Sequence, residues 1–221
     1  MIACLFSGGK DSTLALHRVF ESGRKVELLI TMVSDNEFSY MFHKPNIKYT
    51  RLQAKALEIN QVFATTKGEK EAELTDLEHV LSAHKIDVLI TGATASMYQK
   101  VRIDEICKKL GIMHESPLWK IDGLMELSEL SEHFEVILTR VAADGLDKTM
   151  LGKKLDKEMI DKLLKLNKTR RISLTFEGGE AESFVLDGPL FKKRLQIDKS
   201  HIEKIEGIDT LVIDDMRLVE K

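Results

Sequence analysis

Short apolar runs recur along the first half of the chain, and segments with helical spacing separate them. The runs cover residues 2–6, 26–33, 61–64, 86–91 and 112–114. Several are nearly continuous in apolar residues, as expected of strands buried on both faces of a sheet. Strands that alternate with helices through short connections are typical of a doubly wound parallel sheet. We therefore predict an α/β fold with a five-stranded parallel sheet over residues 1–119.

The pattern changes after Trp119. Helical spacing is found over residues 124–133 and 156–167, and strand-like runs cover 134–141, 172–176, 183–186, 192–197 and 210–218. We expect residues 120–221 to form a smaller α+β domain. In an open parallel sheet, ligands bind at the carboxyl ends of the strands where the strand order reverses. A strand order of 3-2-1-4-5 would place the ends of the first and fourth strands side by side.

The connection after the first predicted strand has the composition of a phosphate-binding turn. It reads Ser7-Gly8-Gly9-Lys10-Asp11-Ser12 and leads directly into a predicted helix. The first N–H groups of a helix have no partner within the helix, and glycines let the backbone approach an anion closely. A plain turn capped by Asp11 or Ser12 is the alternative. Six consecutive residues of suitable type at this boundary favour the phosphate site.

Two further positions are candidates for the same nucleotide site. Ser34 directly follows the second predicted strand, and Gly92 follows the fourth. The alternative for Gly92 is an ordinary strand-to-helix turn. The nucleotide role is favoured because the two stretches that would flank the ligand, Ser7–Ser12 and Thr91–Ser96, are both small and polar.

A second glycine-containing stretch lies in the smaller domain. It reads Glu177-Gly178-Gly179-Glu180 and is followed by Asp187 before Gly188 and Pro189. Composition alone favours a glycine hairpin turn with solvated glutamates over a site, and Asp187 fits simple turn chemistry.

Taken together, these stretches resemble a known family. The Ser-Gly-Gly-x-Asp-Ser loop resembles that of the PP-loop ATP pyrophosphatases, which have an adenine nucleotide α-hydrolase-like fold. The whole chain resembles one branch of them, the diphthine–ammonia ligase family. The matching segments are Met41-Phe42-His43, Thr91-Gly92-Ala93, Tyr98-Gln99-Lys100-Val101-Arg102, Pro117-Leu118-Trp119, Gly145-Leu146-Asp147, Leu151-Gly152-Lys153 and the Glu177–Glu180 stretch with Asp187.

The resemblance implies a reaction and a set of roles. ATP would activate the carboxylate of diphthine on translation elongation factor 2 as an adenylate, and ammonium would displace AMP to give the amide. Ser7, Gly8, Gly9, Lys10, Asp11 and Ser12 would bind ATP, with Ser34 and Gly92 beside them. Lys10 and Asp11 would act in catalysis, with Asp11 as a ligand of Mg²⁺. Glu177 and Glu180 would act on ammonium or the substrate. Tyr98, Arg102, Gly178, Gly179 and Asp187 would contact the substrate.

This chain departs from the family pattern near the second stretch. The family usually has an aromatic residue at Ala181, a threonine at Ser183, and Cys-Gly where this chain has Thr175-Phe176. These changes lie on the implied substrate side rather than in the ATP loop.

Charge and cysteine content weigh against the main alternatives. The formal net charge is −3, whereas a protein that binds a nucleic-acid backbone usually carries an excess of cations. The two cysteines, Cys4 and Cys107, lack the spacing of a zinc or redox pair. We expect a cytoplasmic protein that binds neither nucleic acid nor membrane. A PP-loop enzyme that modifies tRNA, such as a thiolase or lysidine synthetase, and a non-catalytic nucleotide-binding protein remain the alternatives.

Overall fold

The computed structural model describes residues 1–34, 46–66 and 72–221. They form two compact units. The first contains Met1–Ser7 and Asp11–Trp119, and the second contains Gly8–Lys10 and Lys120–Lys221. Gly8, Gly9 and Lys10 of the glycine loop thus pack with the C-terminal part of the chain. The segment Met41-Phe42-His43 lies outside the described residues.

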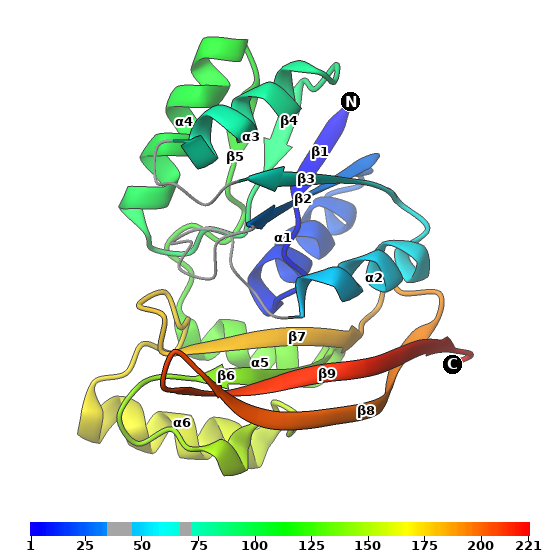
Figure 1. The fold of residues 1–221 in the computed structure, drawn as a ribbon. Helices are drawn as coiled ribbons and strands as arrows, with labels where there is room; N and C mark the ends of the chain where they lie inside the picture. The colour runs from blue at the N-terminus through cyan, green and yellow to red at the C-terminus, as the bar shows by residue number, and fades with distance from the viewer. Residues whose placement is uncertain (35–45, 67–71) are drawn as a thin grey trace. The chain divides into compact units, whose positions relative to one another are not determined.

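The first unit is built on a five-stranded parallel sheet with the order β3-β2-β1-β4-β5 (Figure 1). The prediction of a doubly wound sheet in this order is confirmed. Its short central strand pairs on both sides, since Ala3 is in register with both Leu28 and Leu89. The strands are β1 (Ile2–Leu5), β2 (Leu28–Ser34), β3 (Asn60–Thr66), β4 (Val88–Ile90) and β5 (Met113–Glu115).

Helices cover both faces of this sheet, as Figure 1 shows. On one face, α3 (Ala72–Ser82) and α4 (Met97–Leu110) bury apolar side chains against the strands, among them Leu77, Leu81 and Ile103. On the other lie α1 (Lys10–Glu21) and α2 (Thr50–Leu57), the latter preceded by the 3-10 turn η1 (Ile47–Tyr49). Burial on both faces explains the nearly continuous apolar strands.

The second unit contains a four-stranded antiparallel sheet with the order β7-β6-β9-β8. The predicted α+β character of this part is therefore confirmed. Asp122 and Asp156 cap the two helices, because their carboxylates accept hydrogen bonds from first-turn N–H groups. The elements are α5 (Gly123–His133), β6 (Glu135–Val141), η2 (Lys148–Met150), α6 (Lys157–Arg170), β7 (Ala181–Asp187), β8 (Arg194–Ile205) and β9 (Ile208–Val219).

Two expectations for the second unit are wrong. Residues 172–176 form a turn rather than a strand, because Phe176 donates its N–H to the Ser173 carbonyl and has a left-handed φ of 61°. The last two strands are longer than predicted and form one hairpin. Its turn is Glu206-Gly207, with φ of 54° and 81°, as type I′ turns require. The exposed, charged middle of β8 concealed that extension in the sequence.

Candidate functional site

The stretch Ser7–Ser12 forms a glycine turn at the carboxyl end of β1, and its predicted role in phosphate binding stays a prediction. Phe6 donates its N–H to the Ile30 carbonyl at 2.8 Å, which extends the pairing with β2 by one residue. The chain then leaves the sheet. Gly8 has a φ of 73°, a conformation in which a residue with a Cβ would be strained. The Ser12 hydroxyl accepts from the Ser7 N–H at 3.3 Å and lies 3.2 Å from the Ser7 hydroxyl. These two serines therefore close the turn on itself.

Gly92 lies directly against this loop within the first unit. A Cβ built on Gly92 would be 2.6 Å from the carbonyl carbon of Asp11 and 2.6 Å from the backbone nitrogen of Ser12. Those atoms belong to the main chain, so only glycine fits without moving the loop. Ser34 is the last residue of β2. The predicted nucleotide roles of Gly92 and Ser34 stay predictions, but the structure gives Gly92 a clear packing reason.

Lys10 has its partners inside the second unit. Its ammonium forms an ion pair with Glu126 at 2.6 Å and donates to the Thr175 carbonyl at 2.9 Å. It also lies 5.3 Å from the centre of the Phe176 ring. The side chains of Lys10 and Glu126 are 1% and 0% exposed. The catalytic role predicted for Lys10 stays a prediction, and in this structure its charge neutralises a buried carboxylate.

The backbone on either side of Lys10 is held by β7. Lys10 donates its N–H to the Ser183 hydroxyl at 3.1 Å, and the Val185 N–H donates to the Gly8 carbonyl at 3.0 Å. Ser183 is one of the positions where this chain departs from the family pattern. It supplies the hydroxyl that accepts from the loop.

The Glu177–Glu180 stretch forms a tight turn that leads into β7. The Gly179 N–H donates to the Phe176 carbonyl at 3.0 Å, and Gly179 has a φ of 77°. Glu180 folds back over this turn, where its Oε1 accepts from the Ser173 N–H at 2.9 Å. The hairpin expected from the sequence is therefore replaced by a turn that Glu180 helps to hold. The catalytic and substrate roles predicted for Glu177, Gly178, Gly179 and Glu180 stay predictions.

Asp187 is not brought to that turn. It lies at the other end of β7, about 20 Å along an extended strand that rises about 3.3 Å per residue. There it forms an ion pair with Lys221 at 2.6 Å. It also lines a cavity of about 290 Å³ together with Glu132, His133, Phe134, Glu135, Lys154, Gly188, Pro189 and Lys221.

Tyr98 and Arg102 contact each other on α4. The guanidinium of Arg102 lies 3.5 Å from the centre of the Tyr98 ring, one helical turn away. This is a cation–π arrangement that holds the two side chains together. Their predicted contact with the substrate stays a prediction.

Glu126 is a residue that the sequence analysis missed. It lies on α5 beside the buried Leu127 and Leu130. A carboxylate on the apolar face of an amphipathic helix is a signal that a cationic partner lies inside the core. The glycine loop contains that cation, Lys10.

The two thiols are unsuited to nucleophilic chemistry. Both are buried and free. Burial raises the pKa of Cys4 to about 12. Burial, together with the charge of Asp104, raises the pKa of Cys107 to about 11. Because the thiolate is the reactive form, neither residue resembles a catalytic cysteine.

In the part of the chain that the structure describes, no group of three or more His, Cys, Asp or Glu side chains is arranged to hold a metal ion by itself. Among the same residues, no helix combines the length and apolar character needed to cross a membrane.

The buried ion pair leads to a stability prediction. In Lys10→Met the Glu126 carboxylate keeps its burial but loses the neutralising cation, so the free energy of unfolding should fall by about 3–5 kcal/mol. The double variant Lys10→Met/Glu126→Met should recover most of that loss, because two apolar side chains need no compensation. Urea unfolding of both variants measures this.

Lys162→Met is the matched control, because Lys162 pairs with Glu158 on the exposed side of α6. It should leave the urea midpoint nearly unchanged. Equal effects of Lys10→Met and Lys162→Met would show that the Lys10 pair is not buried as described.

Two models of known protein families together match most of the chain. Residues 1–114 match the family model described as the diphthamide synthase N-terminal domain, and residues 122–219 match the diphthamide synthase C-terminal domain. A solved structure from Methanocaldococcus jannaschii, described as a predicted subunit of tRNA methyltransferase, aligns with a TM-score of 0.48 and 20% identity. That alignment covers 85% of this chain and 96% of the other.

Three curated relatives carry the name diphthine–ammonia ligase. The one from Schizosaccharomyces pombe is 36% identical over 92% of this chain and 37% of its own length, so this chain spans little more than a third of it. The relative from Rattus norvegicus is 33% identical over 90% of this chain and 83% of its own length. The relative from Homo sapiens is 31% identical over 91% and 84%. With both halves matched and these levels of identity, the chain belongs to the diphthine–ammonia ligase family.

Proposed function

We propose that this protein is an ATP-dependent ligase that converts diphthine to diphthamide. The substrate would be diphthine on translation elongation factor 2 in the cytoplasm, and the products would be the amide, AMP and pyrophosphate. The observation that carries the proposal is the loop of residues 7–12. It closes at the carboxyl end of β1 through Ser7 and Ser12, with Gly92 packed against it. Membership of the diphthine–ammonia ligase family supports diphthine as the acceptor of the nitrogen.

The reaction needs activation because a carboxylate is a poor electrophile. A carboxylate oxygen attacks the α-phosphorus of ATP, and the bond to the β-phosphate oxygen breaks to release pyrophosphate. Ammonia then attacks the acyl carbon, AMP leaves with the carboxylate oxygen, and the nitrogen loses a proton. Charge builds up on phosphate oxygens in the first step. Backbone N–H groups of a glycine turn are suited to stabilise such charge.

Mg²⁺ fits the residues present. It is commonly held by one or two carboxylates together with substrate phosphates, so Asp11 alone suffices as the protein ligand when ATP supplies the rest. When bound, the ion would offset the negative charge of the phosphates. Asp11 lies at the start of α1, and its own carbonyl carbon is one of the main-chain atoms that a Cβ on Gly92 would meet.

Glu180 accepts a hydrogen bond from the Ser173 N–H and supports the turn. We assign Glu177 and Glu180 together the contact with ammonium or the trimethylammonium of diphthine. Arg102 and Lys100 are the candidates for the carboxylate of the substrate or the α-phosphate, and Tyr98 is a further candidate for contact with the substrate.

A thiolase-type reaction on tRNA is less well supported. It needs a reactive thiolate, and both thiols of this chain are buried with raised pKa values.

The proposed function is tested by incubation with ATP, ammonium and an elongation factor that carries diphthine. We expect AMP to form only when all three are present, in amounts equal to the amide detected by mass spectrometry with isotopically labelled ammonium. AMP formation that needs tRNA instead of the elongation factor would contradict the proposal.

Gly92→Ala should impair this activity while Ala95→Ser, at an exposed position in the same segment, should not. The added Cβ would lie 2.6 Å from loop backbone, so the loop must move. A misplacement of about 1 Å can lower turnover on the order of a hundredfold. Rates of AMP formation in the two variants measure this, with thermal unfolding as the check on folding. Normal AMP formation by Gly92→Ala would show that the position of the loop does not affect the reaction.

Glu177→Gln should bind ATP normally but lose amide formation, because the amide removes the charge that a cationic substrate needs. Glu180→Gln should be milder, since its amide oxygen can still accept from the Ser173 N–H. A charge-assisted contact is worth about 1.5–3 kcal/mol, which corresponds to a loss in turnover of about ten- to a hundredfold for Glu177→Gln. ATP affinity and ammonium-dependent turnover are measured side by side. If both variants lower turnover only slightly and by the same amount, the stretch Glu177–Glu180 has only a structural role as a turn.

A further inference from the structure

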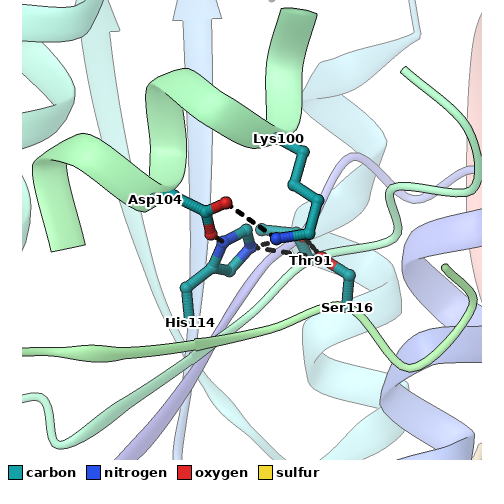
Figure 2. Close-up of polar contacts among 5 residues, drawn as sticks. All are labelled: Thr91, Lys100, Asp104, His114 and Ser116. Carbon is teal, nitrogen blue, oxygen red and sulfur yellow. Dashed lines mark hydrogen bonds and ion pairs between the residues drawn. The ribbon is translucent and has the colours of Figure 1, made fainter. Parts of the chain in front are cut away.

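A buried histidine lies in the first unit at the edge of the sheet where β4 and β5 end. His114 is the middle residue of β5, and its side chain is 3% exposed. Figure 2 shows the ring among Asp104 and Lys100 from α4, Thr91 after β4, and Ser116 after β5. His114 Nδ1 lies 2.6 Å from Asp104 Oδ1, and Nε2 lies 2.8 Å from the Thr91 hydroxyl. His114, Asp104 and Ser116 were assigned no site role from the sequence.

The charge state of the ring follows from its surroundings. Burial lowers the pKa of His114 from its ordinary value of 6.5 and outweighs the opposing effect of Asp104. Burial also tends to raise the pKa of Asp104, but hydrogen bonds from Lys100 and His114 outweigh it, and that pKa is lowered. The ring is therefore neutral and the carboxylate ionised near neutral pH. Nδ1–H donates to Asp104, and Nε2 accepts from the Thr91 hydroxyl.

Few other groups face the ring. Lys100 donates to the second oxygen of Asp104 at 2.7 Å. The Ser116 hydroxyl lies 3.0 Å from the Thr91 hydroxyl and 3.3 Å from His114 Nε2. The neighbouring Glu115 is paired with Arg24. Asp104 and Lys100 are thus the charges that set the protonation of His114.

Thr91 connects this network to the phosphate loop. It is the residue just before Gly92, whose backbone approaches that of Asp11 and Ser12 so closely that a Cβ would not fit. The Thr91 N–H donates to the Glu115 carbonyl at 3.0 Å, and its hydroxyl is held by His114. A displacement of Thr91 would therefore be transmitted through Gly92 to the loop.

We propose that His114 is a positioning residue for the phosphate loop, holding the Thr91 hydroxyl from a ring that Asp104 orients. The proposal deepens the proposed function and rests on it, because ATP is taken as the ligand of the loop. Protonation of Nε2 turns this acceptor into a donor and reverses its hydrogen bond with Thr91. ATP affinity should therefore be full above the ordinary histidine pKa and should fall as the pH drops through the lower pKa of His114.

Three substitutions test the contacts of the His114 ring with Asp104 and with Thr91 one at a time. Gln in His114→Gln can place an amide oxygen near the position of Nε2, so it can accept from Thr91 but cannot titrate. Asn in His114→Asn reaches only toward Asp104 and loses the contact with Thr91. Asp104→Asn removes the charge that raises the pKa of the ring. His79→Gln, at an exposed position on α3, is the control.

The measurement is the dissociation constant for ATP as a function of pH in each purified variant, with thermal unfolding to check folding. ATP itself titrates, so the quantity compared is the ratio of variant to wild type at each pH. His114→Gln should match wild type at pH above 6.5 and bind ATP more tightly than wild type in acid. His114→Asn should bind about three- to tenfold more weakly at high pH, as expected for one lost hydrogen bond. Asp104→Asn should move the acid loss to lower pH.

A constant ratio of one for His114→Gln across the whole pH range would overturn the positioning role. So would wild-type affinity of His114→Asn at high pH. If His114→Asn fails to fold, the His114→Gln profile alone decides. Wild type that binds no ATP at any pH would refute the proposed function and this inference with it, whereas the first two results leave the proposed function intact.

Discussion

The pairing of β1 with a parallel strand on each side is the constraint on which the candidate site depends. β1 is four residues long, and its hydrogen bonds to β2 and β4 fix both its direction and the point where it ends. Because the strands are parallel, the chain after β1 and the chain after β4 leave the sheet at the same edge. That geometry brings Gly92 against Asp11 and Ser12. The loop is therefore positioned by the sheet and not by its own residues alone.

Lys10 adds a second constraint of a different kind. A buried charge is costly unless it is paired and hydrogen-bonded, and Lys10 is both, through Glu126 and the Thr175 carbonyl. The same lysine lies within the loop that we assign to ATP. Under the proposed function, replacing Lys10 changes both folding and catalysis, and activity alone cannot separate the two effects. The residues that surround its ammonium, Thr175 and Phe176, are also those at which this chain departs from the family pattern.

Predictions from the sequence were most accurate where the local hydrophobic pattern reflects burial in the folded structure. The apolar runs predicted the parallel sheet, because strands buried on both faces leave a strong signal, whereas the strand order came with the resemblance to the PP-loop fold. The turn at residues 172–176 was predicted as a strand, since hydrophobicity does not reveal a left-handed residue such as Phe176. The partners Glu126 and His114 were missed, because each depends on a residue remote in sequence. Asp187 was grouped with Glu177 through the family resemblance, but the extended β7 carries it to the other end of that strand.

Under the proposed function, the protein forms an adenylate of its substrate's carboxylate. The most direct test is a turnover experiment with diphthine whose carboxylate oxygens carry a heavy isotope, followed by mass spectrometry of the released AMP. Adenylation joins a carboxylate oxygen to the α-phosphorus, and attack of ammonia leaves that oxygen with AMP. We predict that each amide formed is matched by one AMP that contains one heavy oxygen. AMP without label, or label found only in pyrophosphate or water, would contradict the account.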